Sequence, residues 1–159
     1  MKRPQLGIKA DPVVALPPLR LTATSEELTR FHAYLEEFWG KLPQGYSSAL
    51  NEQWQMLFTT AAAEIISNII THAYGRSDCP GWIDFHLSLY TDCVTGEFTD
   101  RGIYWNGQLG PNLPSAVDIP QMAESGRGMH IIQAATDELK YWRSNDDENH
   151  WLVVKKFSQ

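Results

Sequence analysis

The chain is poor in cysteine, with only Cys79 and Cys93. Two cysteines are too few for the disulfide framework of a small secreted protein, and these two do not form a metal-binding pattern. The sequence also has no apolar run long enough to cross a membrane. Lys2 and Arg3 stand near the start, but no hydrophobic segment follows them, so we expect no secretory signal. These absences favour a protein of the reducing cytoplasm.

Basic residues are outnumbered by acidic ones. The 13 Lys and Arg residues stand against 19 Asp and Glu residues, which gives a net charge of −6. This surplus of negative charge opposes non-specific binding to nucleic acid, although it permits a local basic patch. With 43% hydrophobic and 20% charged residues, the 159-residue chain has the composition of an ordinary globular protein. It is long enough for one domain with a hydrophobic core.

The first half of the sequence predicts two helices. Thr24 and Glu27 have the spacing of a capping box at the start of the first helix, and Gly40 ends it. The second helix should run from about residue 48 to residue 74, where Gly75 caps it. Apolar residues recur at helical spacing in both and should form the core: Leu28, Phe31, Leu35 and Phe38 in the first helix, and Leu57, Phe58, Ala61, Ile65 and Ile69 in the second.

Strands dominate the rest of the chain. Alternating apolar and polar residues, or short apolar runs beside turn residues, predict strands at residues 19–22, 82–90, 93–99, 139–143 and 150–157. A third helix is expected over residues 128–136. Helices on one face of a mixed, mainly antiparallel sheet make an α+β fold, a two-layer α/β sandwich. We expect one domain over residues 19–159. Residues 1–18 should form an extended tail, or a strand that covers a sheet edge.

The most informative feature is a polar stripe inside the second predicted helix. Glu64, Asn68 and His72 are spaced four residues apart within an apolar run. At about 100° per residue, side chains with this spacing stay on one face of a helix. A carboxylate, an amide and an imidazole are costly to bury without partners, so something polar should lie against them. A nucleotide with its metal ion would fit. The alternatives are that Glu64 is a solvated surface group and that His72 only caps or packs the helix end.

Two glycine motifs follow the stripe. Asp100-Arg101-Gly102 comes directly after a predicted strand, and Ser125-Gly126-Arg127-Gly128-Met129 precedes the third helix. Taken alone, the first is commonly a turn and the second a loop, and Arg127 commonly a solvated cation. The order of the three motifs is more specific than any of them.

This order of polar helix stripe, acidic turn and glycine loop resembles the N-box, G1-box and G2-box of the GHKL (histidine-kinase-like) ATPase superfamily. Within that superfamily, the small size of the chain and the pattern Glu-x-x-x-Asn followed by His-Ala-Tyr are similar to the anti-sigma-factor serine kinases of bacterial partner-switching systems. The resemblance covers roughly Leu19 to Phe157 and implies the Bergerat-type sandwich of that superfamily.

The resemblance assigns roles to the stripe. Asn68 would supply one oxygen ligand to the Mg²⁺ ion that accompanies ATP, an ion that takes few protein ligands. Glu64 would be the general base on the incoming hydroxyl group. Residues 103–125 would form the ATP lid, a segment of 20 residues or so that is long enough to be functional or mobile.

The glycine motifs would hold the nucleotide. Asp100 would accept a hydrogen bond from the adenine amino group, and Gly102 would let the backbone pass close to the base. Gly126 and Gly128 would leave backbone N–H groups free for phosphate oxygens at the start of a helix, where the helix dipole favours anions. Arg127 between them would contact a phosphate.

The sequence departs from the family pattern in two places. Tyr104 stands where the G1-box normally has its second glycine, which puts the turn toward the lid in doubt. The family's last strands often carry a threonine near the adenine, and here His150 and Trp151 occupy that region. Adenine binding is therefore expected to be weaker or differently arranged.

The resemblance implies an ATP- and Mg²⁺-dependent protein serine/threonine kinase that acts as an anti-sigma factor. Its phospho-acceptor would be a STAS-domain antagonist, and its second partner a sigma factor or an analogous regulator. No membrane and no direct nucleic-acid partner is expected, and a homodimer is left open. A nucleotide-gated binding module without efficient kinase activity is the main alternative, favoured by the irregular G1-box. The intact glycines oppose a nucleotide-free scaffold, and the lack of a preceding helix pair with a phospho-acceptor histidine opposes a histidine kinase.

Overall fold

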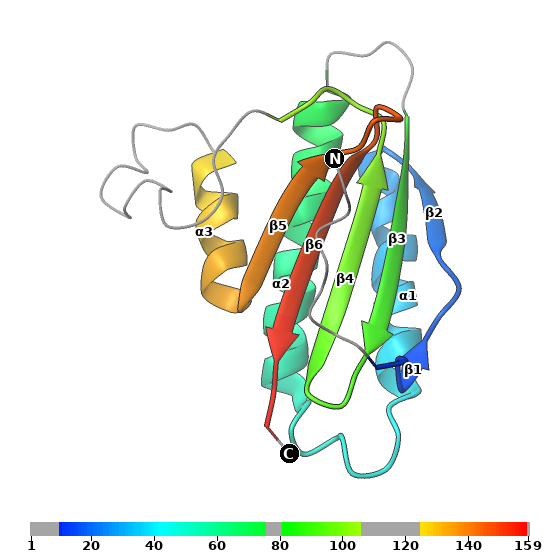
Figure 1. The fold of residues 1–159 in the computed structure, drawn as a ribbon, viewed down its shortest axis with the longest axis vertical. Coiled ribbons are helices and arrows are strands. Elements are labelled where there is room, and N and C mark those ends of the chain that lie inside the picture. Colours follow the sequence, from blue (N-terminus) through cyan, green and yellow to red (C-terminus); the bar gives the residue numbers. More distant parts are fainter. Residues whose placement is uncertain (1–9, 76–80, 106–124, 159) are drawn as a thin grey trace.

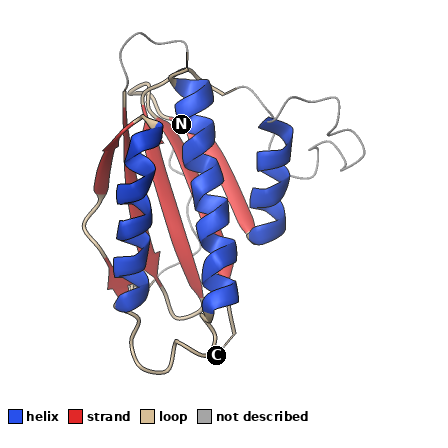
Figure 2. Ribbon diagram, turned by 180° about the vertical axis from the view of Figure 1, so that it is seen from behind, coloured by secondary structure: helices blue, strands red, loops and turns tan. Residues whose placement is uncertain are grey.

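The computed structural model describes residues 10–75, 81–105 and 125–158, with only the backbone described for residues 125–127. Three α-helices lie on one face of a six-stranded sheet (Figures 1 and 2). The predicted α+β fold, a two-layer sandwich with a mainly antiparallel sheet, is therefore confirmed. In the described ranges, no helix is both long and apolar enough to cross a membrane.

The elements follow one another in this order: β1 (Val14–Ala15), β2 (Leu19–Thr22), a 3₁₀ turn η1 (Ser25–Glu27), α1 (Leu28–Gly40), α2 (Glu52–Asn68), a π-helical segment η2 (Ile69–Ala73), β3 (Trp82–Leu89), β4 (Cys93–Asp100), α3 (Ser125–Ala135), β5 (Glu138–Arg143) and β6 (Asn149–Lys156). The strand order is β1–β3–β4–β6–β5, and β2 pairs with the same edge of β3 as β1. All these pairings are antiparallel.

The start of α1 corrects the predicted capping box. The Thr24 side chain makes no cap hydrogen bond. The Glu27 carboxylate instead accepts a hydrogen bond from the backbone N–H of Thr22 at 3.2 Å and pairs with Arg30 at 2.6 Å. Because residues 25–27 fold as a 3₁₀ turn, Glu27 precedes the first α-helical residue and does not lie three residues inside the helix.

Helix α2 is shorter at both ends than the sequence predicts. Asn51 caps its start, where the side-chain oxygen accepts from the backbone N–H of Trp54 at 3.0 Å. Regular α-helix ends at Asn68 and continues as the π-helical segment η2, in which the Tyr74 N–H donates to the Ile69 carbonyl. Leu57 was expected in the core but is 42% exposed, because it points away from the sheet. The other predicted core residues of both helices are buried or packed against the core.

Aromatic rings fill the space between the helices and the sheet. The Phe85 ring of β3 lies 5.0 Å from the Phe31 ring of α1 and 4.5 Å from the Phe98 ring of β4, measured between ring centroids. Phe58 of α2 is also fully buried. Burial on this scale anchors α1 and α2 to the sheet, so that the polar residues of α2 are presented on a rigid support.

Candidate functional site

Glu64 and Asn68 lie on the side of α2 that faces α3. Both side chains are half-buried. A Cβ atom added to Gly128, in the first turn of α3, would lie 2.8 Å from Glu64 Oε2 and 3.6 Å from Asn68 Oδ1. The Asn68 amide also donates to the Met129 sulfur at 3.8 Å. The structure therefore brings the helix stripe and the glycine loop into direct contact.

His72 does not share this surface, contrary to the predicted three-residue stripe. Its side chain is exposed, whereas Glu64 and Asn68 are half-buried. The cause is the π-helical segment η2, which begins at Ile69. In such a segment the hydrogen bonds span five residues, and the wider turn points the His72 side chain in a different direction from the one that a regular α-helix would give. π-Helical turns of this kind are frequent at functional sites.

Asp100 ends β4 as a nearly completely buried carboxylate, 1% exposed. Its Oδ1 accepts hydrogen bonds from the Gly102 backbone N–H and from the Asn149 amide, each at 2.8 Å. Its Oδ2 is buried and has no hydrogen-bond partner among the described residues. Burial raises the pKa of Asp100, while the bonds from Asn149 and Gly102 and the charge of Arg143 oppose the rise. A buried acceptor without a partner is costly, and an adenine amino group is a donor that would satisfy it.

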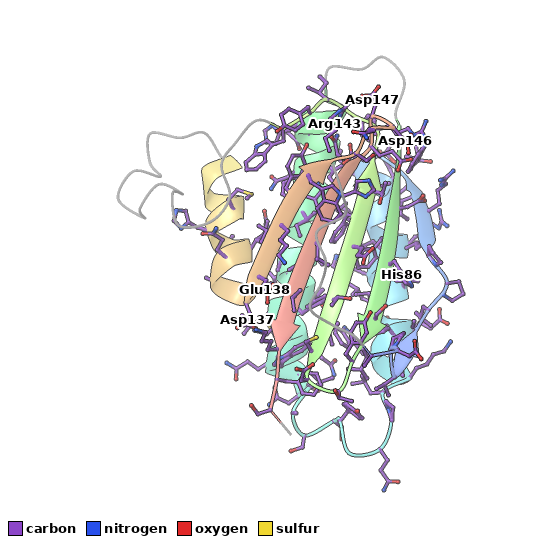
Figure 3. All side chains as sticks on the ribbon, in the orientation of Figure 1. His86, Asp137, Glu138, Arg143, Asp146 and Asp147 are labelled. Carbon is purple, nitrogen blue, oxygen red and sulfur yellow. The ribbon has the colours of Figure 1, made fainter. Side chains whose placement is uncertain are left out.

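Asn149 is the site residue that the sequence analysis missed. It lies directly opposite Asp100 in the β4–β6 register. Its amide nitrogen donates to Asp100 and to the Gly102 carbonyl, and its amide oxygen accepts from the Arg143 guanidinium at 2.7 Å and from the Tyr141 hydroxyl at 3.0 Å. Arg143 lies at the same end of the sheet as Asp146 and Asp147 of the β5–β6 turn (Figure 3). Asn149 thus holds the turn after β4 in place.

His150 and Trp151, which occupy the region of the family's threonine, lie on opposite faces of the sheet, and the weaker or differently arranged adenine binding expected from them stays a prediction. Trp151 is 4% exposed and belongs to the core under the helices. His150 lies on the opposite face of the sheet, where its ring stacks on Trp142 with centroids 5.1 Å apart. Successive residues of a strand point to opposite faces, so Asn149 and Trp151 share the helix-covered face and His150 does not.

Replacing Asn149 with Ala should lower the free energy of unfolding by about 1–3 kcal/mol, because Asp100 and Arg143 then lose a buried hydrogen-bond partner. Urea unfolding followed by circular dichroism measures the change. Gln53→Ala is the control, because Gln53 is exposed on α2 and should change stability by less than about 0.5 kcal/mol. Equal effects of the two substitutions would show that Asn149 does not hold the turn.

Gly102 approaches the end of the same helix. A Cβ atom added to Gly102 would lie 2.6 Å from the Ala73 carbonyl oxygen, and the Ile103 N–H donates to that oxygen at 2.9 Å. The close approach that the structure shows for Gly102 is to the backbone of η2, and its approach to the adenine base stays a prediction. At about 1.5 Å of rise per residue, the α-helical part from Glu64 to Asn68 is roughly 6 Å long, and η2 continues from it to Ala73 beside Gly102.

The start of α3 offers backbone donors at the other end of this span. Gly126 and Gly128 lie in its first turn, where backbone N–H groups have no partner within the helix and the dipole favours anions. The side chain of Arg127 lies outside the described part of the chain, as do residues 106–124, which form most of the predicted lid. Of the lid residues that are described, Ile103 and Tyr104 are more than half exposed.

The described residues do not form a metal site made of several protein ligands. Among the described residues, no group of three or more His, Cys, Asp or Glu side chains could hold a metal ion. The Asn68 amide oxygen faces the first turn of α3 and fits an ion that takes one protein ligand and otherwise binds water and phosphate, as Mg²⁺ does. Cys93 is a buried free thiol, and burial raises its pKa to about 12.

A family model described as the histidine kinase-like ATPase domain matches residues 21–156. The match spans the helix that carries Glu64 and Asn68, the Asp100 turn and the start of α3. No curated protein matches the chain with significance.

Proposed function

The chain belongs to the histidine kinase-like ATPase domain family, and we propose that it is an ATP-dependent protein serine/threonine kinase that acts as an anti-sigma factor. Family membership supports nucleotide binding. The kinase assignment rests on the chemistry of the site and on the resemblance of the Glu64–Tyr74 motif to anti-sigma-factor kinases. The phospho-acceptor is a serine or threonine of a STAS-type antagonist, and the second partner is a sigma factor or an analogous regulator.

The observation that carries the proposal is the position of the Glu64 carboxylate. Its Oε2 lies against Gly128, in the helix turn whose free N–H groups suit phosphate. A hydroxyl oxygen placed there attacks the terminal phosphorus, the bond from that phosphorus to the ADP oxygen breaks, and Glu64 accepts the hydroxyl proton. A base within reach of that proton contributes about 10²–10⁴-fold in rate, while positioning and charge neutralisation supply the rest.

Two other residues orient the nucleotide in this proposal. Asp100 accepts a hydrogen bond from the adenine amino group through Oδ2, the buried oxygen that has no partner among the described residues. Asn68 provides an amide oxygen as a Mg²⁺ ligand, and the ion supplies charge neutralisation on the phosphates when it is bound. Glu64 and Asn68 lie on α2, and the turn after β4 packs on η2, which follows α2 directly. In this proposal, that arrangement holds the adenine and the phosphates at a defined separation.

A nucleotide-gated binding module without efficient kinase activity is the second candidate, and Tyr104 favours it. Tyr104 replaces a glycine of the family's G1-box and is 52% exposed. Its backbone does not adopt the left-handed conformation that favours glycine, because Asp147 is the only non-glycine residue with a positive φ in the described part of the chain. The fold therefore accommodates the tyrosine. In this second candidate, Tyr104 changes how the chain turns toward the predicted lid.

The test is to incubate the purified chain with γ-labelled ATP and a candidate STAS-domain protein from the same organism. Label on a serine or threonine of the STAS protein supports the kinase. Binding of both partners without transfer of label supports the module. Nucleotide binding itself is measured by calorimetry and thermal unfolding, where ATP at about 100 times its Kd should stabilise the protein by roughly 2.7 kcal/mol. No heat and no thermal shift with ATP or ADP would refute both candidates.

Replacing Gly128 with Ala should lower the transfer rate by about 10²-fold, because a displacement on the scale of 1 Å in a catalytic group has costs of that order. The added methyl group would lie 2.8 Å from Glu64 Oε2, so the carboxylate must move. Initial rates with labelled ATP measure the effect. Gly40→Ala is the matched control, since an added Cβ at Gly40 meets no atom within 4 Å. A wild-type rate for Gly128→Ala would mean that the Glu64 carboxylate is not held against α3 during transfer.

A further inference from the structure

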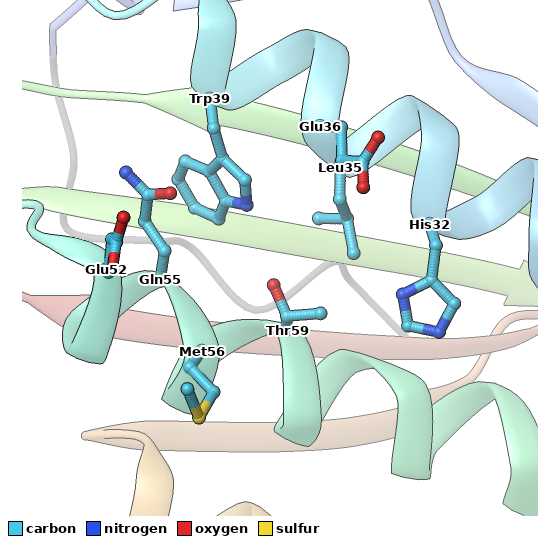
Figure 4. A pocket seen from close by; sticks show the side chains of 8 residues that line it. All are labelled: His32, Leu35, Glu36, Trp39, Glu52, Gln55, Met56 and Thr59. Atoms are coloured by element: carbon cyan, nitrogen blue, oxygen red, sulfur yellow. The ribbon is translucent and has the colours of Figure 1, made fainter.

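A groove of about 360 Å³ lies between α1 and α2. It opens on the side of α2 that faces α1, whereas the candidate nucleotide site lies on the side that faces α3 (Figure 2). Its lining comes from both helices (Figure 4): His32, Leu35, Glu36 and Trp39 from α1, and Glu52, Gln55, Met56 and Thr59 from α2. Neither the family assignment nor the proposed kinase reaction uses any of these residues.

The wall of this groove contains a buried donor that is not satisfied. The Trp39 indole Nε1 is buried and has no hydrogen-bond partner among the described residues. Figure 4 shows the indole ring extending from α1 toward α2, between Gln55 and Leu35. Aromatic contacts with Phe38, Trp54 and Phe58 hold the ring, so it cannot easily turn away to find a partner. A buried indole N–H normally has an acceptor, and its lack here indicates that an acceptor from outside would be favourable.

The rim of the groove is acidic. Glu36 on α1 and Glu52 on α2 are both exposed, and within the described residues neither forms an ion pair. The neighbouring Glu37, by contrast, pairs with Lys41 at 2.9 Å. Two carboxylates on facing helices attract a cationic side chain, and the field between them is complementary to lysine or arginine.

The floor and one edge of the groove are apolar. Met56 is 67% exposed, the largest exposed fraction of any large apolar residue in the described part of the chain. Leu35 is buried at the bottom of the groove. Methionine adapts its shape and is common on surfaces that bind peptides, so Met56 can cover an apolar side chain placed on Leu35.

We propose that this groove binds a basic amphipathic segment of a partner protein. An apolar side chain of the segment packs on Leu35 and Met56. A backbone carbonyl accepts the hydrogen bond from Trp39 Nε1 once the side chains that cover this buried atom move aside. Basic side chains of the segment lie beside Glu36 and beside Glu52, which Figure 4 shows apart along the groove with Trp39 and Gln55 between them. The groove residues take no part in the proposed nucleotide binding or phosphate transfer. Peptide binding in the groove can therefore be tested independently of the proposed kinase activity.

Two fluorescent peptides of equal length and identical leucine pattern test the proposal, one with lysine and the other with glutamate at the polar positions. Binding to the full chain is followed by fluorescence anisotropy. We expect the lysine peptide to bind at least about tenfold more tightly than the glutamate peptide, and Glu36→Gln with Glu52→Gln to weaken it about tenfold. Trp39→Phe keeps an aromatic ring but removes the donor, and it should weaken binding several-fold. Circular dichroism checks that each variant is folded.

The matched control is Glu26→Gln with Asp146→Asn, which changes the net charge equally at two exposed positions outside the groove. It should leave binding of the lysine peptide within about twofold of wild type at physiological salt, where distant charges are screened. The proposal is overturned if the control weakens binding as much as the groove variant, because net charge alone would then explain it. It is also overturned if the Glu36/Glu52 variant binds the lysine peptide like wild type. It is overturned as well if sedimentation shows that the wild-type chain dimerises and the Glu36/Glu52 variant does not, because a second copy would then cover the groove.

Discussion

Glu64→Gln should lower the rate of phosphate transfer to the STAS partner by about 10²–10⁴-fold and leave nucleotide affinity close to wild type. The amide keeps the size of the carboxylate but cannot accept the hydroxyl proton. Because Glu64 is half-buried against Gly128 in the wild-type chain, the isosteric change should not disturb the packing of α3 on α2. Initial rates with labelled ATP measure transfer, and calorimetry with ADP measures affinity.

Partner binding by the Glu64→Gln variant separates catalysis from docking. The carboxylate faces α3, so binding of the STAS protein should change little. Glu26→Gln is the control for the chemical change, since Glu26 is an exposed residue of the turn η1, before α1. Transfer at the wild-type rate by Glu64→Gln would place the base elsewhere. His72 is then the first residue to replace, although its exposed position in η2 makes it a poor candidate.

Asp100→Ala should weaken ATP and ADP binding by about 10- to 100-fold, with or without Mg²⁺. The variant loses the acceptor for the adenine amino group, and hydrogen bonds to charged groups contribute about 1.5–3 kcal/mol, at 1.4 kcal/mol per tenfold in affinity. It also leaves the Gly102 N–H and the Asn149 amide without their acceptor. Calorimetry with and without Mg²⁺ measures the affinity. Asn68→Ala provides the contrast, because it should weaken binding only when Mg²⁺ is present.

Asp100→Asn distinguishes loss of the adenine contact from damage to the fold. Its amide oxygen can still accept from Gly102 and Asn149, so urea unfolding should stay close to wild type. Its amide nitrogen then occupies the place of Oδ2 and cannot accept from adenine, so nucleotide affinity should fall nearly as far as in Asp100→Ala. Wild-type affinity in Asp100→Asn would remove Asp100 from the adenine site.

The sequence predicted the parts of the site that depend on local spacing. Glu64 and Asn68 stand one helical turn apart, and this periodicity places them on one face whatever else the chain does. The position of His72 could not be predicted in the same way, because α- and π-helical turns have no distinct sequence pattern here. The predicted capping box was wrong for a related reason. Residues 25–27 form a 3₁₀ turn, and α1 begins only after them.

Asn149 shows what local patterns cannot supply. Its partner Asp100 is 49 residues away in the sequence, and their contact is set by the register of β4 with β6. A shift of one residue in that register would turn Asn149 away and bring another side chain to Asp100. The sequence showed an asparagine at the start of the last strand, but only the assembled sheet shows that it clamps the turn after β4. The groove between α1 and α2 is likewise a product of helix packing and has no motif.

The buried carboxylate of Asp100 should make adenine binding depend on pH. Because burial raises its pKa in the folded chain, protonation of Asp100 contributes stability below the ordinary value of 3.8, and this contribution is lost as the pH rises through the raised pKa. A hydrogen-bond donor from adenine favours the ionised form of Asp100, so a bound nucleotide lowers the pKa of Asp100. Nucleotide binding therefore releases a fraction of a proton at pH values near the raised pKa. Calorimetry in buffers of different ionisation enthalpy should detect the release in the wild type and not in Asp100→Asn. The nucleotide and the proton therefore behave as competing ligands of one oxygen atom.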